Sequence, residues 1–281
     1  MISSTANNKV KRLVALTQKA KARREEQCFV VEGTRMFCEA PADWIREVYV
    51  SESFLYRCEN ETNAEIRCIL NRYSYEVFTD TVFQKVSDTR TPQGVLCVLS
   101  MPQYELTEWI ERWTADDRKK TPLLVLLEDL QDPGNLGTIL RASEGAGVDG
   151  VILTRQTADI FNPKVIRATM GSIYRVPFFI VDTLIETVEL LKKKGVAVYA
   201  AHLDDSVAYD TLDYTQPTAF LIGNEGSGLQ RETAECATQY IKIPMAGQVE
   251  SLNAAMAAAI LMYEAARQKR SGNYYTFFTE I

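Results

Sequence analysis

Histidine is nearly absent from this sequence, which has one, His202, among 281 residues. Zinc sites draw heavily on histidine and Ser-His-Asp triads require it, so neither kind of chemistry is indicated here. The cysteines are scattered without a CxxC pair, so neither a zinc site nor a disulfide framework is expected. They are Cys28, Cys38, Cys58, Cys68, Cys97 and Cys236. We therefore expect no bound metal.

Long apolar runs are missing as well. No segment approaches the roughly 20 consecutive apolar residues that a membrane-spanning helix needs. Residues 1–27 are rich in lysine and arginine and lack the apolar stretch of a secretory signal. We therefore expect a soluble, cytoplasmic protein with no membrane partner. The net charge of −6 argues against a protein that coats nucleic acid with its whole surface, so any RNA contact must be local.

The length and the hydrophobic pattern predict two α/β domains. Residues 1–104 contain a basic amphipathic helix at 10–24 and short strands at 28–31, 47–50 and 94–99, which indicates a small α/β domain. We interpret residues 105–120 as a linker. In residues 121–281, continuous apolar strands alternate with helices, which is typical of a parallel sheet covered on both faces. Its strands are predicted at 123–128, 151–153, 176–181, 196–201, 219–223 and 240–243.

One glycine motif must be set aside. Residues 145–150 read GAGVDG and fit the dinucleotide-binding pattern GxGxxG. That motif works only when a strand precedes it and a helix follows, because the helix N-terminus must face the phosphate. Here a predicted helix precedes Gly145 and a strand follows Gly150. We therefore interpret these glycines as the end of a helix, which leaves a nicotinamide-dependent oxidoreductase as a distant alternative.

Three loops that follow predicted strands carry the chemical groups. They cover residues 128–141, 221–229 and 241–253, and parallel sheets bind ligands at this end of their strands. Beside glycines and uncharged polar residues, Arg141 and Glu225 stand out as charged candidates. A Walker lysine, which a triphosphate would require, is absent. The loops suit a cationic, mostly organic cofactor better.

The same loops resemble the three motifs of the SpoU (TrmH-type) branch of the SPOUT RNA methyltransferases. Residues 135–141 match N-x-G-x-I-x-R, residues 223–226 read GNEG, and residues 243–253 match I-P-M-x-G-x-x-x-S-L-N. Residues 162–177 also look like that family. The N-terminal segments KRL at 11–13 and FVVEG at 29–33 are similar to its substrate-binding domain, whose fold is akin to ribosomal protein L30e.

The resemblance implies a fold, a reaction and a cofactor. The C-terminal parallel-sheet domain would contain a deep trefoil knot, a rare exception to unknotted topology, and would follow a small L30e-like α/β domain. The chain would be a homodimer that transfers a methyl group from S-adenosylmethionine to a ribose 2′-hydroxyl of RNA. The active site would lie near the partner subunit.

The resemblance also assigns residues. The catalytic candidates are Asn135, Arg141, Glu225, Ser251 and Asn253. The cofactor-binding candidates are Ile222, Gly223, Asn224, Ile243, Met245 and Leu252. The RNA-binding candidates in the basic N-terminal helix are Lys11, Arg12, Lys21, Arg23 and Arg24. Ser251 is in addition predicted as the N-cap of a long helix that runs to about residue 270.

The chemical roles follow from the side chains. A guanidinium is effectively always protonated, so we interpret Arg141 as a stabiliser of the developing alkoxide or a clamp on the adjacent phosphate. Glu225, or a water that it orients, would then take the proton of the 2′-hydroxyl. We favour a 23S-type rRNA stem-loop as substrate, with tRNA as the alternative. A non-catalytic RNA-binding assembly factor is the competing function.

Overall fold

The computed structural model describes residues 1–60, 64–115 and 121–278. Its contacts divide the chain into two compact units. The first consists of Met1–Gln103 together with Asp159–Tyr174, and the second of Tyr104–Ala158 together with Arg175–Ile281. The second unit is thus interrupted by a segment that folds with the first.

The first unit contains a four-stranded sheet of order β1-β4-β2-β3. Strand β4 is antiparallel to both β1 and β2, and β3 is parallel to β2. The predicted strands are present, and β3 was not predicted. The strands are β1 (Cys28–Glu32), β2 (Ile45–Ser51), β3 (Tyr75–Phe78) and β4 (Val95–Ser100).

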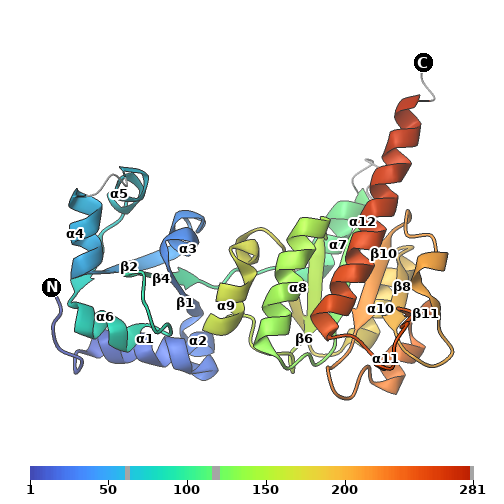
Figure 1. Ribbon diagram of the computed structural model, residues 1–281, viewed down its shortest axis with the longest axis horizontal. Helices are drawn as coiled ribbons and strands as arrows, with labels where there is room; N and C mark the ends of the chain where they lie inside the picture. Colours follow the sequence, from blue (N-terminus) through green and yellow to red (C-terminus); the bar gives the residue numbers. More distant parts are fainter. Residues whose placement is uncertain (61–63, 116–120, 279–281) are drawn as a thin grey trace. The chain divides into compact units, whose positions relative to one another are not determined.

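Helices of the first unit surround this sheet (Figure 1). They are α1 (Asn8–Gln18), α2 (Ala20–Glu26), α3 (Thr34–Cys38), α4 (Glu52–Asn60), α5 (Ala64–Leu70) and α6 (Asp80–Val86). The basic segment at 10–24 was predicted as one helix, but it breaks at Lys19, whose backbone is extended. The break lets Arg23 donate to the carbonyls of Leu16 and Thr17, which the end of α1 leaves without helical partners.

The segment Asp159–Tyr174 completes the first unit. It contains α9 (Pro163–Thr169) and the 3₁₀ turn η1 (Ser172–Tyr174). The ring of Phe161 lies 4.8 Å from that of Phe29 in β1, and the Tyr174 hydroxyl donates to the Met36 carbonyl at 3.0 Å. Apolar side chains of the segment, including Val165 and Ile166, are thereby buried.

The second unit is built on a parallel seven-stranded sheet of order β7-β6-β5-β10-β8-β11-β9. The predicted parallel sheet is confirmed. Only the two-residue edge strand β9 was not predicted. The strands are β5 (Leu123–Leu127), β6 (Gly150–Thr154), β7 (Phe178–Val181), β8 (Ala197–Ala201), β9 (Val207–Ala208), β10 (Thr218–Ile222) and β11 (Gln239–Lys242).

Helices cover both faces of this sheet. One core cluster joins Leu124 and Leu126 of β5 to Ile110 of α7 and Leu184 of α10. Alternate strand residues point the other way, and there α12 packs against β10 and β5 with α8 beside it (Figure 1). The helices are α7 (Leu106–Ala115), α8 (Pro133–Ala146), α10 (Leu184–Lys193), the 3₁₀ turn η2 (Tyr209–Thr211), α11 (Arg231–Glu235) and α12 (Ala254–Phe278).

The end of α8 agrees with the sequence prediction, whereas the start of α12 does not. Helix α8 ends at Ala146, and Gly147 adopts the left-handed conformation of a helix C-cap with φ of 73°. The dinucleotide-binding reading of residues 145–150 is therefore excluded, as predicted. In contrast, Ser251 is not an N-cap, because α12 begins at Ala254. The cap is Asn253, whose side-chain oxygen accepts from the N–H groups of Ala255 and Met256.

Much of the predicted linker, residues 105–120, is a helix that packs in the second unit. Ten of its residues form α7, whose Ile110 and Trp109 belong to the core of the second unit. Residues 116–120 lie outside the described part. The trefoil knot stays a prediction from the resemblance. Within the described residues, no helix combines the length and apolar character needed to cross a membrane.

Candidate active site

The carboxylate of Glu225 joins two of the three motif loops. Its two oxygens accept from the backbone N–H groups of Gln131 and Asp132, each at 2.9 Å. One oxygen also accepts from the side-chain amide of Asn135 at 3.0 Å. Strands β5 and β10 are parallel neighbours, so the loops that follow them emerge at the same edge of the sheet. Glu225 therefore ties the loop after β10 to the start of α8.

These contacts set the ionisation of Glu225. Partial burial acts to raise the pKa of this carboxyl, but the hydrogen bonds from Gln131, Asn135 and Asp132 outweigh it and hold the pKa below its ordinary value. A carboxylate with a lowered pKa is a weak base, and both of its oxygens are already engaged. These contacts favour a positioning role for Glu225, and the predicted transfer of the 2′-hydroxyl proton to Glu225, or to a water that it orients, stays a prediction.

The same network extends to the third loop. Asn253 donates its side-chain amide to the Asn135 oxygen at 2.9 Å. Asn135 itself is held by Asp132, whose carboxylate caps α8 by accepting the Asn135 N–H at 2.7 Å. Glu225, Asn135 and Asn253, predicted from three separate motifs, therefore lie in one hydrogen-bonded chain.

The loop at 223–228 is a tight turn. Asn224 and Gly228 exchange two backbone hydrogen bonds of 3.0 Å each. A side chain at Gly223 would lie 2.3 Å from the Gly228 carbonyl carbon, so only glycine fits there. Asn224 accepts from the N–H groups of Gly226 and Ser227 and donates to the Asp129 carbonyl. Its side chain therefore shapes the loop, and its predicted contact with the cofactor stays a prediction.

Asp129 is a site residue that the motifs did not indicate. It adopts a left-handed backbone with φ of 52°, which is unusual for a residue other than glycine. Its carboxylate accepts from Thr154 at 2.7 Å and from the Gln230 amide at 3.1 Å, and its carbonyl accepts from Asn224. The neighbouring buried Glu128 accepts the Gln230 N–H at 2.7 Å. The only sequence signal was an acidic pair directly after an apolar strand.

The loop at 243–252 has the features expected of a cofactor-binding strip. Within the described chain, its backbone N–H and C=O groups have no hydrogen-bond partners. Ile243, Met245 and Leu252 are half-buried, whereas residues 246–251 are exposed. Unpaired backbone groups beside partly covered apolar side chains suit a ligand with polar edges and an apolar body. These are the three residues of this loop that were predicted to bind the cofactor.

Two predicted catalytic residues lie apart from the network. Arg141 is exposed on α8 and makes no hydrogen bond or ion pair with any described residue. Ser251 is likewise exposed and without a partner in the described chain. Both side chains are free to meet a ligand or a second subunit. No cluster of His, Cys, Asp and Glu that could hold a metal occurs among the described residues.

The structure corrects two of the RNA-binding candidates. Arg23 is only 2% exposed and pairs with Asp159, so it cannot reach RNA. Arg12 forms ion pairs with Glu26 and Glu47 at 2.6 and 2.9 Å. Because these partners neutralise it, Arg12 is a poor phosphate contact.

The other three candidates remain available. Lys11 and Arg24 are exposed, and no described residue pairs with their side chains. Lys21 is exposed and has only a long contact of 3.7 Å to Glu25, of a kind that contributes little.

The chain is similar to known proteins over most of its length. Residues 122–263 match the model of the SpoU rRNA Methylase family, and residues 7–97 match the MRM3-like substrate binding domain. A relative from Bacillus subtilis, 23S rRNA (guanosine(2553)-2'-O)-methyltransferase RlmP, is 34% identical over 264 residues. That match covers 93% of this chain and 97% of the relative.

Solved structures are similar over nearly the whole chain. The rRNA methyltransferase from Sinorhizobium meliloti is 31% identical with a TM-score of 0.79, covering 95% of this chain and 96% of that one. The SpoU methyltransferase AviRb from Streptomyces viridochromogenes, in complex with AdoMet, is 26% identical with a TM-score of 0.79, covering 94% and 100%. The chain therefore belongs to the SpoU rRNA methylase family and is an S-adenosylmethionine-dependent RNA 2′-O-methyltransferase.

Proposed function

We propose that this enzyme methylates a ribose in a stem-loop of 23S-type rRNA and that it works as a homodimer in the cytoplasm. The single observation that supports the site is the chain of hydrogen bonds from Glu225 through Asn135 to Asn253, which draws three motif loops together. The rRNA substrate is supported by the Bacillus subtilis relative, which aligns along almost its full length.

The cofactor would be held mainly by backbone groups. Gly223 and the loop at 243–252 offer them, and Ile222, Ile243, Met245 and Leu252 add apolar surface, whereas Asn224 keeps the turn in shape. This donor set fits a cationic cofactor that needs no metal. When bound, S-adenosylmethionine supplies the methyl group and, as a sulfonium, its own leaving group.

The remaining residues orient the ribose and stabilise charge. Asn135 and Asn253 present amide groups at an exposed surface, and Glu225 fixes their positions. The unpaired guanidinium of Arg141 stabilises the alkoxide that develops as the 2′-hydroxyl loses its proton, and Ser251 contacts the ribose or its phosphate. Since Glu225 is engaged and weakly basic, the proton passes to solvent water.

The function is tested by methylation of total rRNA and tRNA, with the modified ribose mapped by its resistance to alkaline cleavage. We expect one blocked position in 23S-type rRNA. Arg141→Ala should lower turnover by about 100-fold, as loss of a preorganised charge does, with unchanged affinity for S-adenosylmethionine. Arg112→Ala, which removes an exposed arginine of α7, serves as control. Methyl transfer to tRNA alone, or to neither RNA, would show that the proposed substrate is wrong.

Glu225→Gln distinguishes positioning from proton transfer. Hydrogen bonds to a charged group contribute roughly 1.5–3 kcal/mol, so turnover should fall at least about tenfold and to a similar extent as in Asn135→Ala. If turnover falls by more than about 100-fold beyond the fall in Asn135→Ala, Glu225 acts as the general base.

The stability of the same variant should depend on pH. Because the folded-state pKa of Glu225 is lowered, its contribution is fully present above the ordinary value of 4.5 and is lost as the pH falls through the folded value. The difference in unfolding free energy between wild type and Glu225→Gln should thus be constant above about pH 5.5 and shrink below pH 4.5.

RNA binding by the N-terminal unit should depend on exposed cations that have no close acidic partner. We propose that Lys11, Lys19, Lys21 and Arg24, all exposed, contact phosphates. Replacing any one of them by glutamine should flatten the dependence of log Kd on log salt by about one unit. Arg12→Gln, on the same helix as Lys11, is the matched control, and it should lower stability while leaving the slope unchanged. Equal slopes for all variants would locate RNA binding elsewhere.

The exposed face of α12 supports the homodimer. Met256 and Tyr263 lie two turns apart on this helix and are 56% and 47% exposed. Contiguous exposed apolar surface is typical of an interaction site, and these two side chains would begin such a surface on α12. Met256→Glu should convert a dimer at micromolar concentration into a monomer by sedimentation. Leu203→Glu, at an equally exposed apolar residue outside α12, should not. An active wild-type monomer would contradict the proposal.

A further inference from the structure

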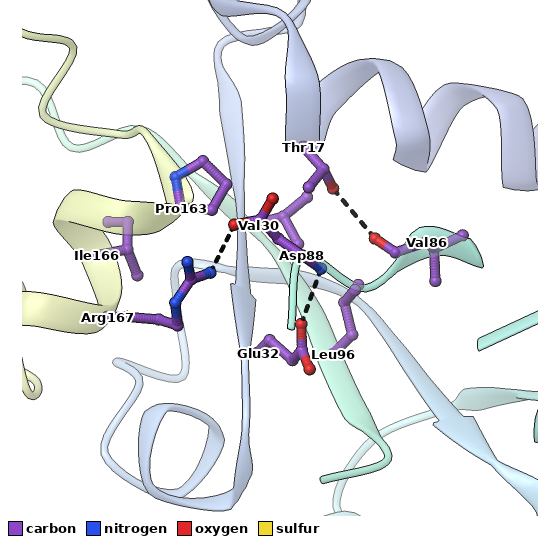
Figure 2. A pocket seen from close by; sticks show the side chains of 9 residues that line it. All are labelled: Thr17, Val30, Glu32, Val86, Asp88, Leu96, Pro163, Ile166 and Arg167. Atoms are coloured by element: carbon purple, nitrogen blue, oxygen red, sulfur yellow. Dashed lines mark hydrogen bonds and ion pairs between the residues drawn. The ribbon is translucent and has the colours of Figure 1, made fainter. Parts of the chain in front are cut away.

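The segment Asp159–Tyr174 has no part in the site described above, although its sequence resembles the family. It leaves the second unit after Ala158, folds with the first unit and returns at Arg175. Figure 2 shows Arg167 of this segment turned toward Asp88, beside Ile166 and Pro163. The segment is thus held by side chains of the first unit, while both of its ends continue into strands of the catalytic sheet.

A buried ion pair fixes the first residue of the segment. Both Nε and Nη2 of Arg23 donate to one oxygen of Asp159, at 3.0 and 2.5 Å. The side chains are only 3% and 17% exposed. The other terminal nitrogen of Arg23 donates to the carbonyls of Leu16 and Thr17. The guanidinium therefore makes four hydrogen bonds to protein acceptors.

This pair is not free to separate. A guanidinium taken out of water needs its counter-charge, because an unpaired buried charge is strongly destabilising. Asp159 also accepts the N–H of Phe161 with its second oxygen at 3.1 Å. The position of Asp159 is thus determined by the first unit.

The residues just before Asp159 are hydrogen-bonded to the catalytic loop, residues 129–132, which contains the backbone donors to Glu225. Ala158 donates its N–H to the Leu130 carbonyl at 2.8 Å. The Gln131 side chain donates to the Gln156 carbonyl at 2.8 Å, and Thr154 binds Asp129. Gln131 is in turn one of the two backbone donors to Glu225. A displacement of Asp159 would therefore move Ala158 and, through its hydrogen bond to Leu130, the backbone that binds Glu225.

We propose that Asp159 and Arg23 are positioning residues that couple the substrate-binding unit to the catalytic loop at 129–132. Arg23 of the first unit fixes Asp159, and Ala158 transmits this constraint to Leu130 and Gln131. The N-terminal unit then contributes to turnover as well as to RNA affinity. This inference rests on the proposed function, since it requires that the first unit binds the RNA substrate.

A second ion pair, which also holds the segment Asp159–Tyr174 within the first unit, provides the control. Arg167 pairs with Asp88 at 2.8 Å, but both side chains are 35% exposed. Exposed pairs of this kind contribute little. Arg167 also lies eight residues after Asp159 and has no described hydrogen bond to residues 128–135. Arg167 therefore anchors the segment, but no described hydrogen bond links it to the catalytic loop.

The test compares Asp159→Asn with Asp88→Asn by steady-state RNA methylation. Coupling between sites usually amounts to about 5–150-fold, and we expect kcat to fall about tenfold in Asp159→Asn. The KM for RNA and the Kd for S-adenosylmethionine should change less than about twofold. Asp88→Asn should retain the wild-type kcat. Equal kcat values for both variants would overturn the proposal.

Two further measurements keep the test decisive. If the unpaired arginine destabilises Asp159→Asn, the uncharged pair Arg23→Gln with Asp159→Asn should recover the melting temperature and keep the low kcat. Hydrogen exchange at the Gln131 and Asp132 amides, measured without RNA, should be faster in both Asp159 variants than in wild type or Asp88→Asn. If exchange is faster in the variants but the wild type does not methylate rRNA, only the proposed substrate is wrong. If exchange is unchanged in the variants, the coupling is wrong.

Discussion

The carboxylate of Glu225 is the interaction on which the site depends. The loops after β5 and β10 each expose backbone N–H groups or side-chain amides at the same edge of the sheet, and a single negative charge satisfies three of these donors. Without it, the N–H groups of Gln131 and Asp132 would lose their acceptor and α8 would lose part of its anchoring at Asn135. The helix dipole favours a negative charge at this position as well.

One consequence is a division of labour between charged and uncharged groups. The carboxylates of Glu225 and Asp129 accept hydrogen bonds that hold the loops in shape. Asn135 and Asn253 are held in turn, because Asn135 donates to Glu225 and Asn253 donates to Asn135. Arg141 is left unpaired among the described residues, so its charge is available for the substrate. A site with only one such cation and no metal-binding cluster in its described part suits methyl transfer from a sulfonium, which needs orientation more than acid-base catalysis.

The sequence predicted those features that local patterns determine. Apolar runs gave the parallel strands, and the helix before Gly145 excluded a dinucleotide site. Features that depend on distant partners could not be predicted. Arg12 and Arg23 looked like RNA ligands because their acids Glu47 and Asp159 lie 35 and 136 residues away. The grouping of Asp159–Tyr174 with the first unit, and the engagement of Glu225, arise from tertiary contacts of the same kind.

The central claim is that Glu225 remains an ionised hydrogen-bond acceptor and orders the loops. Its most direct test is the titration of the Glu225 side-chain carbon by NMR in the intact enzyme, with Glu225→Gln used to assign the resonance. The hydrogen bonds described here predict a pKa below the ordinary value of 4.5. A pKa above that value, moving toward neutrality, would contradict the claim and identify Glu225 as the group that takes the proton.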